Sequence, residues 1–338
     1  MAGGPSTVGL VAAASGAGAF AFLAGGYKTA PGLAEEMAAV RDAGVASFGV
    51  NVFVPGTPTA EAAALAGYLA SLEPEAAALG AALGSSEWDD DAYAEKLDLL
   101  VAEPPAMVSF TFGSPEPGAV RSLQAAGVRV AVTVTTPEEA AVALRVGPDC
   151  LCLQGAEAGA HRGSFGNDDR PDQDRPVRAL LAAVRRRTRV PLIAAGGVAG
   201  PADVVRLLAG GAAMVQAGTS FLRCAESGAH PVHKDALADP ASTGTGVTRA
   251  YSGRRARGVV NAMMRDHQDA PAAYPEINNA TRPLRAAAAA AADSGHMSIY
   301  AGTGFRSAAA GSAAEIVAWL VSGLAQEGGG DGAAGVES

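Results

Sequence analysis

The chain has 338 residues, a formal net charge of −9 and an aromatic content of only 5%. The acidic balance argues against nucleic acid and acidic membrane surfaces as partners. The uncharged segment 7–27 lacks a basic start and is rich in alanine and glycine, which favours a buried helix and strand over a signal peptide or membrane span. Cys150 and Cys152 lie two apart in a predicted strand, a poor disulfide geometry, so we expect free thiols and a cytoplasmic protein.

Short apolar runs alternate with helical patterns over the first two thirds of the chain. Strands are expected at residues 19–23, 47–54, 107–112, 129–134, 150–153, 190–195 and 212–217. Helices are expected at residues 31–43, 59–72, 88–102, 116–126, 137–146 and 201–208. This alternation predicts right-handed βαβ units and a parallel sheet.

The seven predicted strands are one short of a closed (β/α)8 barrel. The chain opens with the small residues of segment 1–7 and passes straight into a helical pattern, as the first strand-to-helix loop of a barrel would. We therefore expect an α/β TIM barrel whose first strand lies before Met1, so that the chain is truncated at its amino end. An open seven-stranded sheet is the alternative.

The alternation of strands and helices ends after residue 221. The patterns there predict helices at 223–239 and 254–266, a strand or loop at 243–251, a loop at 274–282 and a last amphipathic helix at 312–324. We expect four parts in all: a cofactor-binding barrel (1–221), a small helical domain on the substrate side (222–295), a C-terminal motif and helix that return to the barrel (296–325), and a disordered tail (326–338).

Two predicted strands near the middle of the chain end at glycines, in segments 191–197 and 213–219. Glycine lets a ligand approach bare backbone N–H groups, and the loops after strands 7 and 8 form the common phosphate site of a barrel. Unpaired amides and the dipole of the following helix attract anions at such places. The pattern therefore predicts a phosphate-bearing cofactor.

Segment 153–163 supplies further candidate site residues at the end of another predicted strand. Gln154 would lie at the carboxyl end, where an amide can donate to or accept from a cofactor ring, and Gly159 would let the loop turn close to a ligand. A lone histidine is usually structural, but the glycine-rich loop around His161 favours a catalytic role. Asn51, a polar residue in an apolar strand, needs a partner that is either backbone or a ligand.

Two other observations argue against a metal site and against a glycine-rich nucleotide-binding loop. His230 and His233 flank a proline, and no acidic or cysteine partner recurs nearby, so we expect no metal site. The chain also lacks a Gly-x-Gly-x-x-Gly after a first strand and a P-loop sequence.

Taken together, these segments resemble the class I nitronate monooxygenases, formerly called 2-nitropropane dioxygenases. The resemblance covers most of the chain and includes the motif Gln-Gly-Ala-Glu-Ala-Gly-Ala-His-Arg-Gly at 154–163. The other matching segments are 1–7, 23–27, 49–53, 108–113, 191–197, 213–219, 252–258, 274–279 and 300–304. Several co-linear motifs at matching spacing are far more specific than any one of them.

The resemblance implies an FMN-bound barrel with a small helical domain. The residues that it assigns to FMN are Asn51, Gln154, Gly159, Gly196, Gly197, Gln216, Ala217, Gly218 and Thr219. It makes His161 the catalytic residue above the flavin and places Tyr300 in the substrate pocket. Arg162 and Arg254 are candidate donors to an anionic substrate.

The implied reaction is the oxidation of an alkyl nitronate, such as propionate 3-nitronate, with O2, and the cofactor carries the chemistry. The expected partners are a small nitronate or nitroalkane and O2, in a monomer or homodimer. Two alternatives stay open. One is an FMN-dependent NAD(P)H reductase of quinones or enoyl thioesters on the same barrel, and the other is a non-catalytic flavin-binding pseudo-enzyme.

Overall fold

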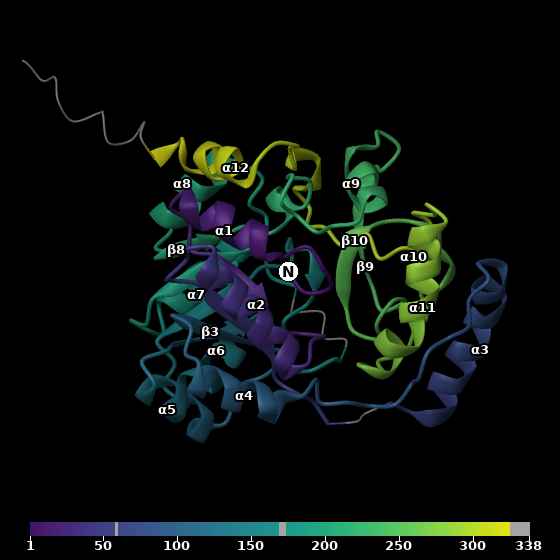
Figure 1. Ribbon diagram of the computed structural model, residues 1–338, viewed down its shortest axis with the longest axis horizontal. Helices are drawn as coiled ribbons and strands as arrows, with labels where there is room; N and C mark the ends of the chain where they lie inside the picture. The colour runs from purple at the N-terminus through teal and green to yellow at the C-terminus, as the bar shows by residue number, and fades with distance from the viewer. Residues whose placement is uncertain (58–59, 169–173, 325–338) are drawn as a thin grey trace, which may run out of the picture.

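A seven-stranded parallel sheet organises the protein, for which a computed structural model describes residues 1–57, 60–168 and 174–324. The strands are β1 (Phe22–Ala24), β2 (Gly49–Phe53), β3 (Met107–Thr111), β4 (Arg129–Val134), β5 (Cys150–Gln154), β7 (Leu192–Ala195) and β8 (Met214–Gln216). Each strand pairs with the next of these along the chain, so β1 and β8 are the ends of the order. The seven predicted strands are confirmed, and the curled sheet with its outer helices is a TIM-barrel type of α/β fold (Figure 1).

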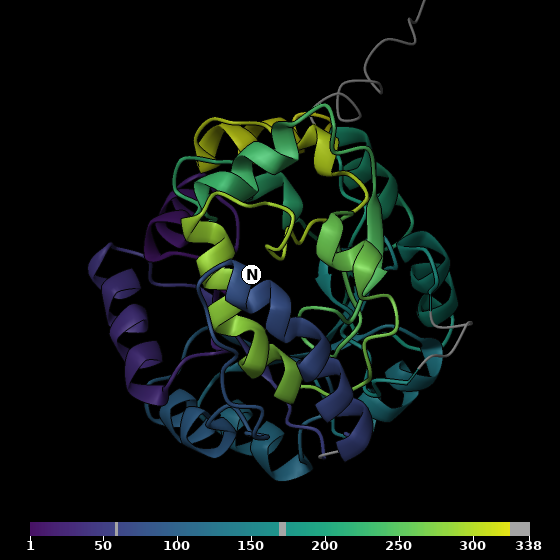
Figure 2. The same ribbon diagram turned by 90° about the vertical axis from the view of Figure 1, so that its right-hand side faces the viewer.

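Helices cover the outer side of this sheet, as Figure 2 shows. They are α1 (Val8–Gly16), α2 (Ala30–Asp42), α4 (Tyr93–Ala102), α5 (Pro117–Ala125), α6 (Pro137–Leu144), α7 (Val177–Arg185), α8 (Pro201–Ala209) and α12 (Ala313–Val321), with short 3-10 helices η2 (Thr219–Phe221) and η3 (Phe305–Ser307). Thr7, Thr29 and Thr136 begin three of them, because each threonine hydroxyl accepts a hydrogen bond from the backbone N–H three residues ahead.

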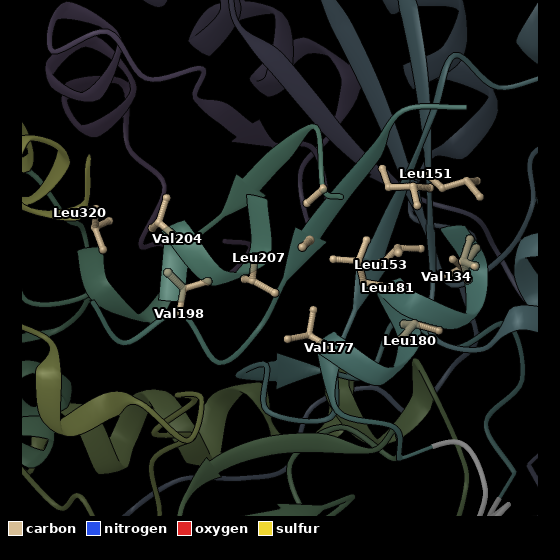
Figure 3. Packing of buried hydrophobic residues seen from close by; sticks show 14 of the residues in the cluster. Val134, Leu151, Leu153, Val177, Leu180, Leu181, Val198, Val204, Leu207 and Leu320 are labelled. Atoms are coloured by element: carbon tan, nitrogen blue, oxygen red, sulfur yellow. The ribbon is translucent and has the colours of Figure 1, made fainter. Parts of the chain in front are cut away.

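The main apolar core lies between the strands and these helices. Leu151 and Leu153 of β5 are fully buried, and they belong to the same core as Leu180, Leu181 and Val184 of α7 (Figure 3). Parallel strands are buried on both faces, which is why they appear in the sequence as continuous apolar runs. Each buried leucine stabilises the fold by about 1.5–3 kcal/mol relative to an exposed one.

A second layer, which we call the cap, covers the carboxyl end of β5 and its neighbours. Its sheet is antiparallel and has the order β6 (Ala160–His161), β10 (Ala256–Val259), β9 (Thr245–Thr248). The cap helices are α3 (Ala62–Ala78), α9 (Pro231–Ala238), α10 (Ala262–Asp266) and α11 (Glu276–Ala290). Helices α3 and α11 lie side by side (Figures 1 and 2), so a segment from the first quarter of the chain also builds the cap.

The cap corrects several predictions made from the sequence. It contains a sheet as well as helices, and the strand or loop predicted at 243–251 contains β9. The helix predicted at 223–239 is wrong for its first half, because α9 begins only at Pro231. Gly228 packs against the backbone of Gly4, and its N–H donates to the carbonyl of Pro5 at 3.2 Å in place of an intrahelical acceptor. Proline at a first helical position then starts α9.

The helix predicted at 254–266 is also wrong for its first part, where β10 pairs with strands on both sides. The loop predicted at 274–282 is wrong in turn, since α11 begins at Glu276. Asparagines and Pro283 in this segment disfavour a helix locally, but Ile277 and Leu284 are fully buried. Tertiary packing therefore overrides local propensity there.

Three further predictions concern membrane-spanning helices, the cysteines and the C-terminal tail. Within the described ranges, no helix has the length and apolar character needed to cross a membrane. The three cysteines are free, as predicted, and buried. The tail predicted at 326–338 lies outside the described residues.

We expect Leu151→Ala to lower the free energy of unfolding by about 2–5 kcal/mol, because the substitution leaves a cavity in the main core. Urea denaturation followed by circular dichroism measures this. The control is Val142→Ala on the outside of α6, where the side chain is 41% exposed, and a change below about 0.5 kcal/mol is expected there. Equal losses in both variants would contradict this view of the core.

Candidate active site

Glycines that follow β5 and β7, a glycine of the C-terminal motif and a threonine that follows β8 meet in one place. We call it the glycine cluster: Gly159, Gly196, Gly197 and Gly302, with Thr219. A Cβ at Gly159 would lie 2.4 Å from the backbone nitrogen of Gly302, and one at Gly302 would lie 2.6 Å from the carbonyl oxygen of Glu157. The N–H of Gly302 donates to the Thr219 hydroxyl at 2.9 Å. The loops after β5, β7 and β8 thus meet with their backbones in contact, and no side chain would fit between them at Gly159 or Gly302.

The backbone of this cluster has free hydrogen-bonding capacity. Gly196 and Gly197 have φ angles of +104° and +68°, which favour glycine. In the described part of the chain, the N–H groups of Gly196, Gly197 and Gly218 donate to no acceptor. Helix α8 begins just beyond, at Pro201. Unpaired amides before a helix are suited to an anion, so these residues fit the phosphate of a cofactor.

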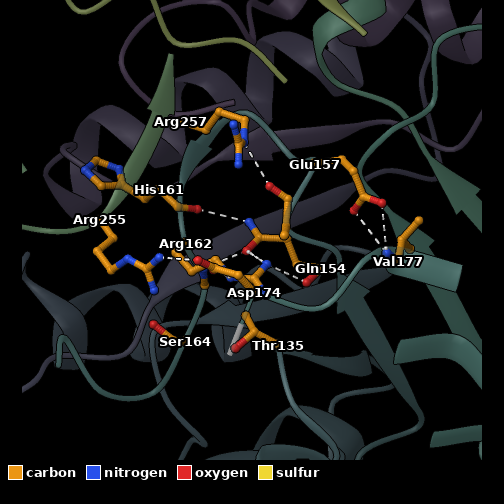
Figure 4. A network of polar contacts seen from close by, with 12 residues as sticks. Thr135, Gln154, Glu157, His161, Arg162, Ser164, Asp174, Val177, Arg255 and Arg257 are labelled. Carbon is orange, nitrogen blue, oxygen red and sulfur yellow. Dashed lines mark hydrogen bonds and ion pairs between the residues drawn. The ribbon is translucent and has the colours of Figure 1, made fainter. Parts of the chain in front are cut away.

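Gln154, at the end of β5, ties the loop that carries His161 to the barrel (Figure 4). Its side-chain nitrogen donates to the carbonyl oxygen of His161 at 3.0 Å, and its side-chain oxygen accepts from the N–H of Gly163 at 2.8 Å. Arg162 donates to the backbone carbonyl of Gln154 at 2.6 Å. The amide therefore holds the loop, and its predicted contact with a flavin stays a prediction.

Aromatic rings surround His161, and we call Phe112, Tyr274 and Tyr300 its aromatic cage. Their ring centroids lie 5.8, 5.6 and 5.4 Å from that of the imidazole. Phe112 follows β3 with a φ angle of +78°, an unusual backbone conformation for a side chain of that size. Strain of this kind persists where the surroundings fix it, and it is concentrated at functional sites.

The electrostatic environment keeps His161 neutral. Burial, together with the positive charges of Arg254 and Arg285, lowers the pKa of His161 to about 3. The Ser252 hydroxyl lies 2.8 Å from Nε2 of His161 and donates to the carbonyl of Arg254 at 3.1 Å. Because a hydroxyl has one proton, Nε2 then carries the imidazole proton and Nδ1 keeps a lone pair. The cage thus presents a neutral histidine in positive surroundings.

A row of polar side chains crosses the inner side of the sheet below the cage. The Asn51 amide on β2 donates to the hydroxyls of Ser109 and Thr111 on β3 at 2.8 and 2.9 Å. Thr111 in turn lies 3.4 Å from the Thr133 hydroxyl on β4. Asn51 therefore has protein partners, which answers the question of how its amide is satisfied, while its role toward FMN stays a prediction.

The two candidate arginines lie in different places. Arg162 points away from the cage and forms a 3.8 Å ion pair with Asp174. Arg254 is 7% exposed and lies over the Phe112 ring, with its guanidinium carbon 4.0 Å from the ring centroid. It also lines a cavity of about 430 Å³, together with Tyr27 and Tyr274. The geometry therefore favours Arg254 over Arg162 as the group that meets an anion.

Not every predicted residue joins these groups. Gln216 is exposed on the end strand β8, where its side-chain oxygen accepts a hydrogen bond from the thiol of Cys152 at 3.4 Å. Ala217 and Gly218 follow it toward η2, and a Cβ at Gly218 would touch only Met1. Tyr300 is in the cage, as the resemblance implies for a pocket residue, and the carbonyl oxygen of Tyr300 lies 3.1 Å from the imidazole of His233.

Sequence reasoning assigned no role to Ser252, Phe112, Tyr274 or Tyr27. All four lie inside segments that carry the family resemblance, so a signal was available. A linear motif does not give the direction of a side chain, and the cage forms only when segments far apart in the sequence come together. The arrangement is typical of α/β-barrel enzymes, which carry their sites on the loops after the strands.

Comparisons with known proteins agree with this class. A family model described as nitronate monooxygenase matches residues 1–323. The nitronate monooxygenase of Pseudomonas aeruginosa is 36% identical over 329 residues, covering 94% of this chain and 92% of that protein. A probable nitronate monooxygenase of Bacillus subtilis is 34% identical over 314 residues, covering 91% of this chain and 89% of that protein. The chain therefore belongs to the nitronate monooxygenase family, whose members are flavin-dependent oxidoreductases.

Solved structures give the same picture. A nitroalkane oxidase from Streptomyces ansochromogenes superimposes with a TM-score of 0.92 at 42% identity, covering 96% of this chain and 94% of that one. FabK from Thermotoga maritima superimposes with a TM-score of 0.73 at 22% identity over 97% of this chain and 91% of that one, a likeness of fold alone.

We expect Gly196→Ala to destabilise the protein by about 1–2 kcal/mol, because a Cβ is unfavourable at positive φ. The new Cβ would also lie 3.0 Å from the backbone nitrogen of Ala158, so flavin content should fall. The control is Gly118→Ala in α5, where a Cβ meets nothing within 4 Å and helix propensity rises by about 0.5–1 kcal/mol. Thermal unfolding and flavin absorbance measure both effects, and unchanged flavin content in Gly196→Ala would contradict the assignment.

We expect the His161 imidazole to stay neutral between pH 8 and pH 5, since its folded-state pKa of about 3 lies below the ordinary 6.5. As the pH falls below 6.5 the unfolded chain takes up a proton that the folded protein does not, so stability is lost over this range. Imidazole 15N chemical shifts measure the charge, with His161→Asn to assign the signal. The variant should lose less stability from pH 7 to pH 5, and an imidazole that titrates near 6.5 would refute the expectation.

Proposed function

We propose that this protein is an FMN-dependent nitronate monooxygenase that oxidises alkyl nitronates, such as propionate 3-nitronate, with O2. The observation that carries the proposal is the neutral imidazole of His161, held in an aromatic cage beside Arg254 and Arg285. Burial is the main cause of its lowered pKa, and among the described residues the charged groups that lower it further, Arg254 and Arg285, are both cations. A site of this charge favours an anion, and a nitronate is the anion of a nitroalkane.

The glycine cluster supports the cofactor part of the proposal. The unpaired amides of Gly196 and Gly197 would hold the FMN phosphate, together with Thr219 at the start of η2. Gly218, outside the cluster but next to Thr219, would offer a further unpaired amide. When bound, FMN supplies the oxidation of the substrate and the reaction with O2. The protein supplies binding, orientation and charge.

His161 and Tyr300 would act on the nitro group. With Nε2 of His161 bonded to Ser252, the Nδ1 lone pair would accept a proton from a neutral nitroalkane, and the nitronate anion formed beside it would stabilise the imidazolium. Burial raises the pKa of the Tyr300 hydroxyl, and the positive charge of Arg285 and the nearby Ser252 hydroxyl offset part of that rise. The Tyr300 hydroxyl makes no well-formed hydrogen bond to a described residue, so it would donate to a nitro oxygen.

The rings of the cage would keep water away from the reacting carbon. Phe112 and Tyr274 stack edge to face with centroids 5.5 Å apart, and Phe53 lies 4.5 Å beyond Phe112. A lower local polarity strengthens each charge interaction with the bound anion. Substrate orientation would therefore come from the rings, while the two arginines would make the surroundings of His161 positive, a charge that lysine in either place would keep.

Anaerobic mixing of purified, FMN-loaded protein with propionate 3-nitronate tests the proposal. We expect the flavin absorbance to bleach with the nitronate, which is already deprotonated, in both the parent protein and His161→Asn. Turnover of the neutral nitro form, 3-nitropropionate, should fall about 10²–10⁴-fold in His161→Asn with flavin content unchanged. The control is His230→Asn, an exposed residue that caps α9, because asparagine also caps helices. Bleaching by NADH but not by the nitronate would overturn the proposal in favour of a reductase.

A further inference from the structure

The cavity beside the cage is a built site with an unmatched positive charge. Three hydrogen bonds of Arg254 run to backbone carbonyls, those of Arg162, Ser164 and Gly166. No carboxylate oxygen lies within ion-pair distance of its guanidinium among the described residues, and its Nη1 makes no hydrogen bond there. A guanidinium this deeply buried is costly without a partner anion.

A second donor faces the same cavity. The hydroxyls of Tyr27 and Tyr274 share one hydrogen bond of 3.2 Å, with Tyr274 as the donor. Two hydroxyls joined by one bond leave one O–H proton unengaged, here that of Tyr27, which makes no other bond among the described residues. Both tyrosines line the cavity with Arg254. The cavity therefore offers at least two convergent donors to an anion.

The position of Tyr27 is fixed from behind. Its φ angle is +66°, and its N–H donates to the Asp91 carboxylate at 2.8 Å. Asp91 pairs with Lys96 at 2.7 Å, and the Lys96 side chain is fully buried. A buried ion pair has a large desolvation cost, and backbone strain is concentrated at functional sites. The two together at Tyr27 therefore indicate that the position of its hydroxyl has a function.

The three carboxylates that line the cavity bond to groups other than Arg254. Asp91 is used by Lys96 and by the Tyr27 backbone. Asp89 accepts from the side chain of Asn279 at 2.6 Å, and Asp90 accepts from the N–H of Ala92 at 3.1 Å. Arg254 is therefore the buried cation without an opposite partner in the described wall of the cavity. Arg282 has no ion pair there either, but its side chain is exposed.

We propose that this cavity is a second anion-binding subsite, in which Arg254 and Tyr27 bind a carboxylate of the substrate remote from its nitronate carbon. The inference rests on the proposed function and deepens it, because it makes Arg254 a specificity-determining residue. The nitronate end would lie at His161 and the carboxylate end beyond Phe112, whose ring separates the two groups. Substrates with both ends charged would then be preferred over neutral alkyl nitronates.

The test compares two substrates that differ only in the carboxylate: propionate 3-nitronate and propyl 1-nitronate. We expect Arg254→Lys to raise KM for propionate 3-nitronate roughly 10- to 100-fold, because it loses the planar fork of a charge-assisted pair. KM for propyl 1-nitronate should change less than about threefold. Tyr27→Phe, which removes only a hydroxyl, should also raise KM for propionate 3-nitronate more than KM for propyl 1-nitronate. This variant tests the subsite if Arg254→Lys does not fold.

The matched control is Arg285→Lys. Arg285 acts on the charge of His161 but does not line the cavity, so this variant should affect both nitronates alike. Equal effects of Arg254→Lys on the two substrates would overturn the subsite, because they would show a general loss of positive charge.

A binding measurement separates failure of the subsite from failure of the proposed function. Trp88 lines the cavity, and Trp319, the second of two tryptophans, lies on α12. In a Trp319→Phe background, 3-nitropropionate should change the Trp88 fluorescence and 1-nitropropane should not, whether or not the protein turns over a nitronate. No response to 3-nitropropionate, or the same response to both compounds, would overturn the inference, while bound 3-nitropropionate without nitronate turnover would refute only the proposed function.

Discussion

The hydrogen bonds of the Gln154 side chain join the barrel to the chemistry above it. Through this amide the end of β5 holds the carbonyl of His161 and the N–H of Gly163, and so sets the path of the loop between them. That path lets His161 and its neighbour form β6, which pairs with β10 of the cap. Ser252 reaches the imidazole only because the cap is anchored there. One amide thus connects the rigid sheet with the residues that would act on a substrate.

The charge distribution around this junction is one-sided. His161 is neutral because it is buried and because two arginines lie near it, and Arg254 has rings and carbonyls as its neighbours. Buried cations without carboxylates are unfavourable in an isolated protein. A bound anion would pair with these cations, so the free energy that their burial costs in the free protein would be offset when the anion binds. The glycine cluster follows the same logic with unpaired amides in place of guanidinium groups.

Backbone strain is concentrated at the same edge of the barrel. Tyr27, Phe112 and Ala160 have left-handed backbone conformations; the first two follow shortly after a strand, and Ala160 is the first residue of β6. Such conformations turn the chain sharply at the carboxyl end of a strand and direct the rings of Tyr27 and Phe112 toward the cavity. Packing against Phe53 and the Asp91–Lys96 pair supports them. The stability of the apolar core below, whose strands are buried on both faces, offsets this backbone strain.

The sequence by itself determined the parallel sheet, because buried strands need continuous apolar runs and the crossover helices need a different period. It also located the glycine strand ends and His161, because glycines after a strand admit a ligand and the glycine-rich loop after β5 carries this histidine. Only the tertiary structure decided the cap and the cage. In the cap, helix α11 forms although Pro283 lowers the local helix propensity, and β10 forms because strands lie on both sides of it. The charges of Arg162 and Arg254 look alike in the sequence, but one pairs with Asp174 and the other faces a cavity, because side-chain direction depends on contacts between segments far apart in the chain.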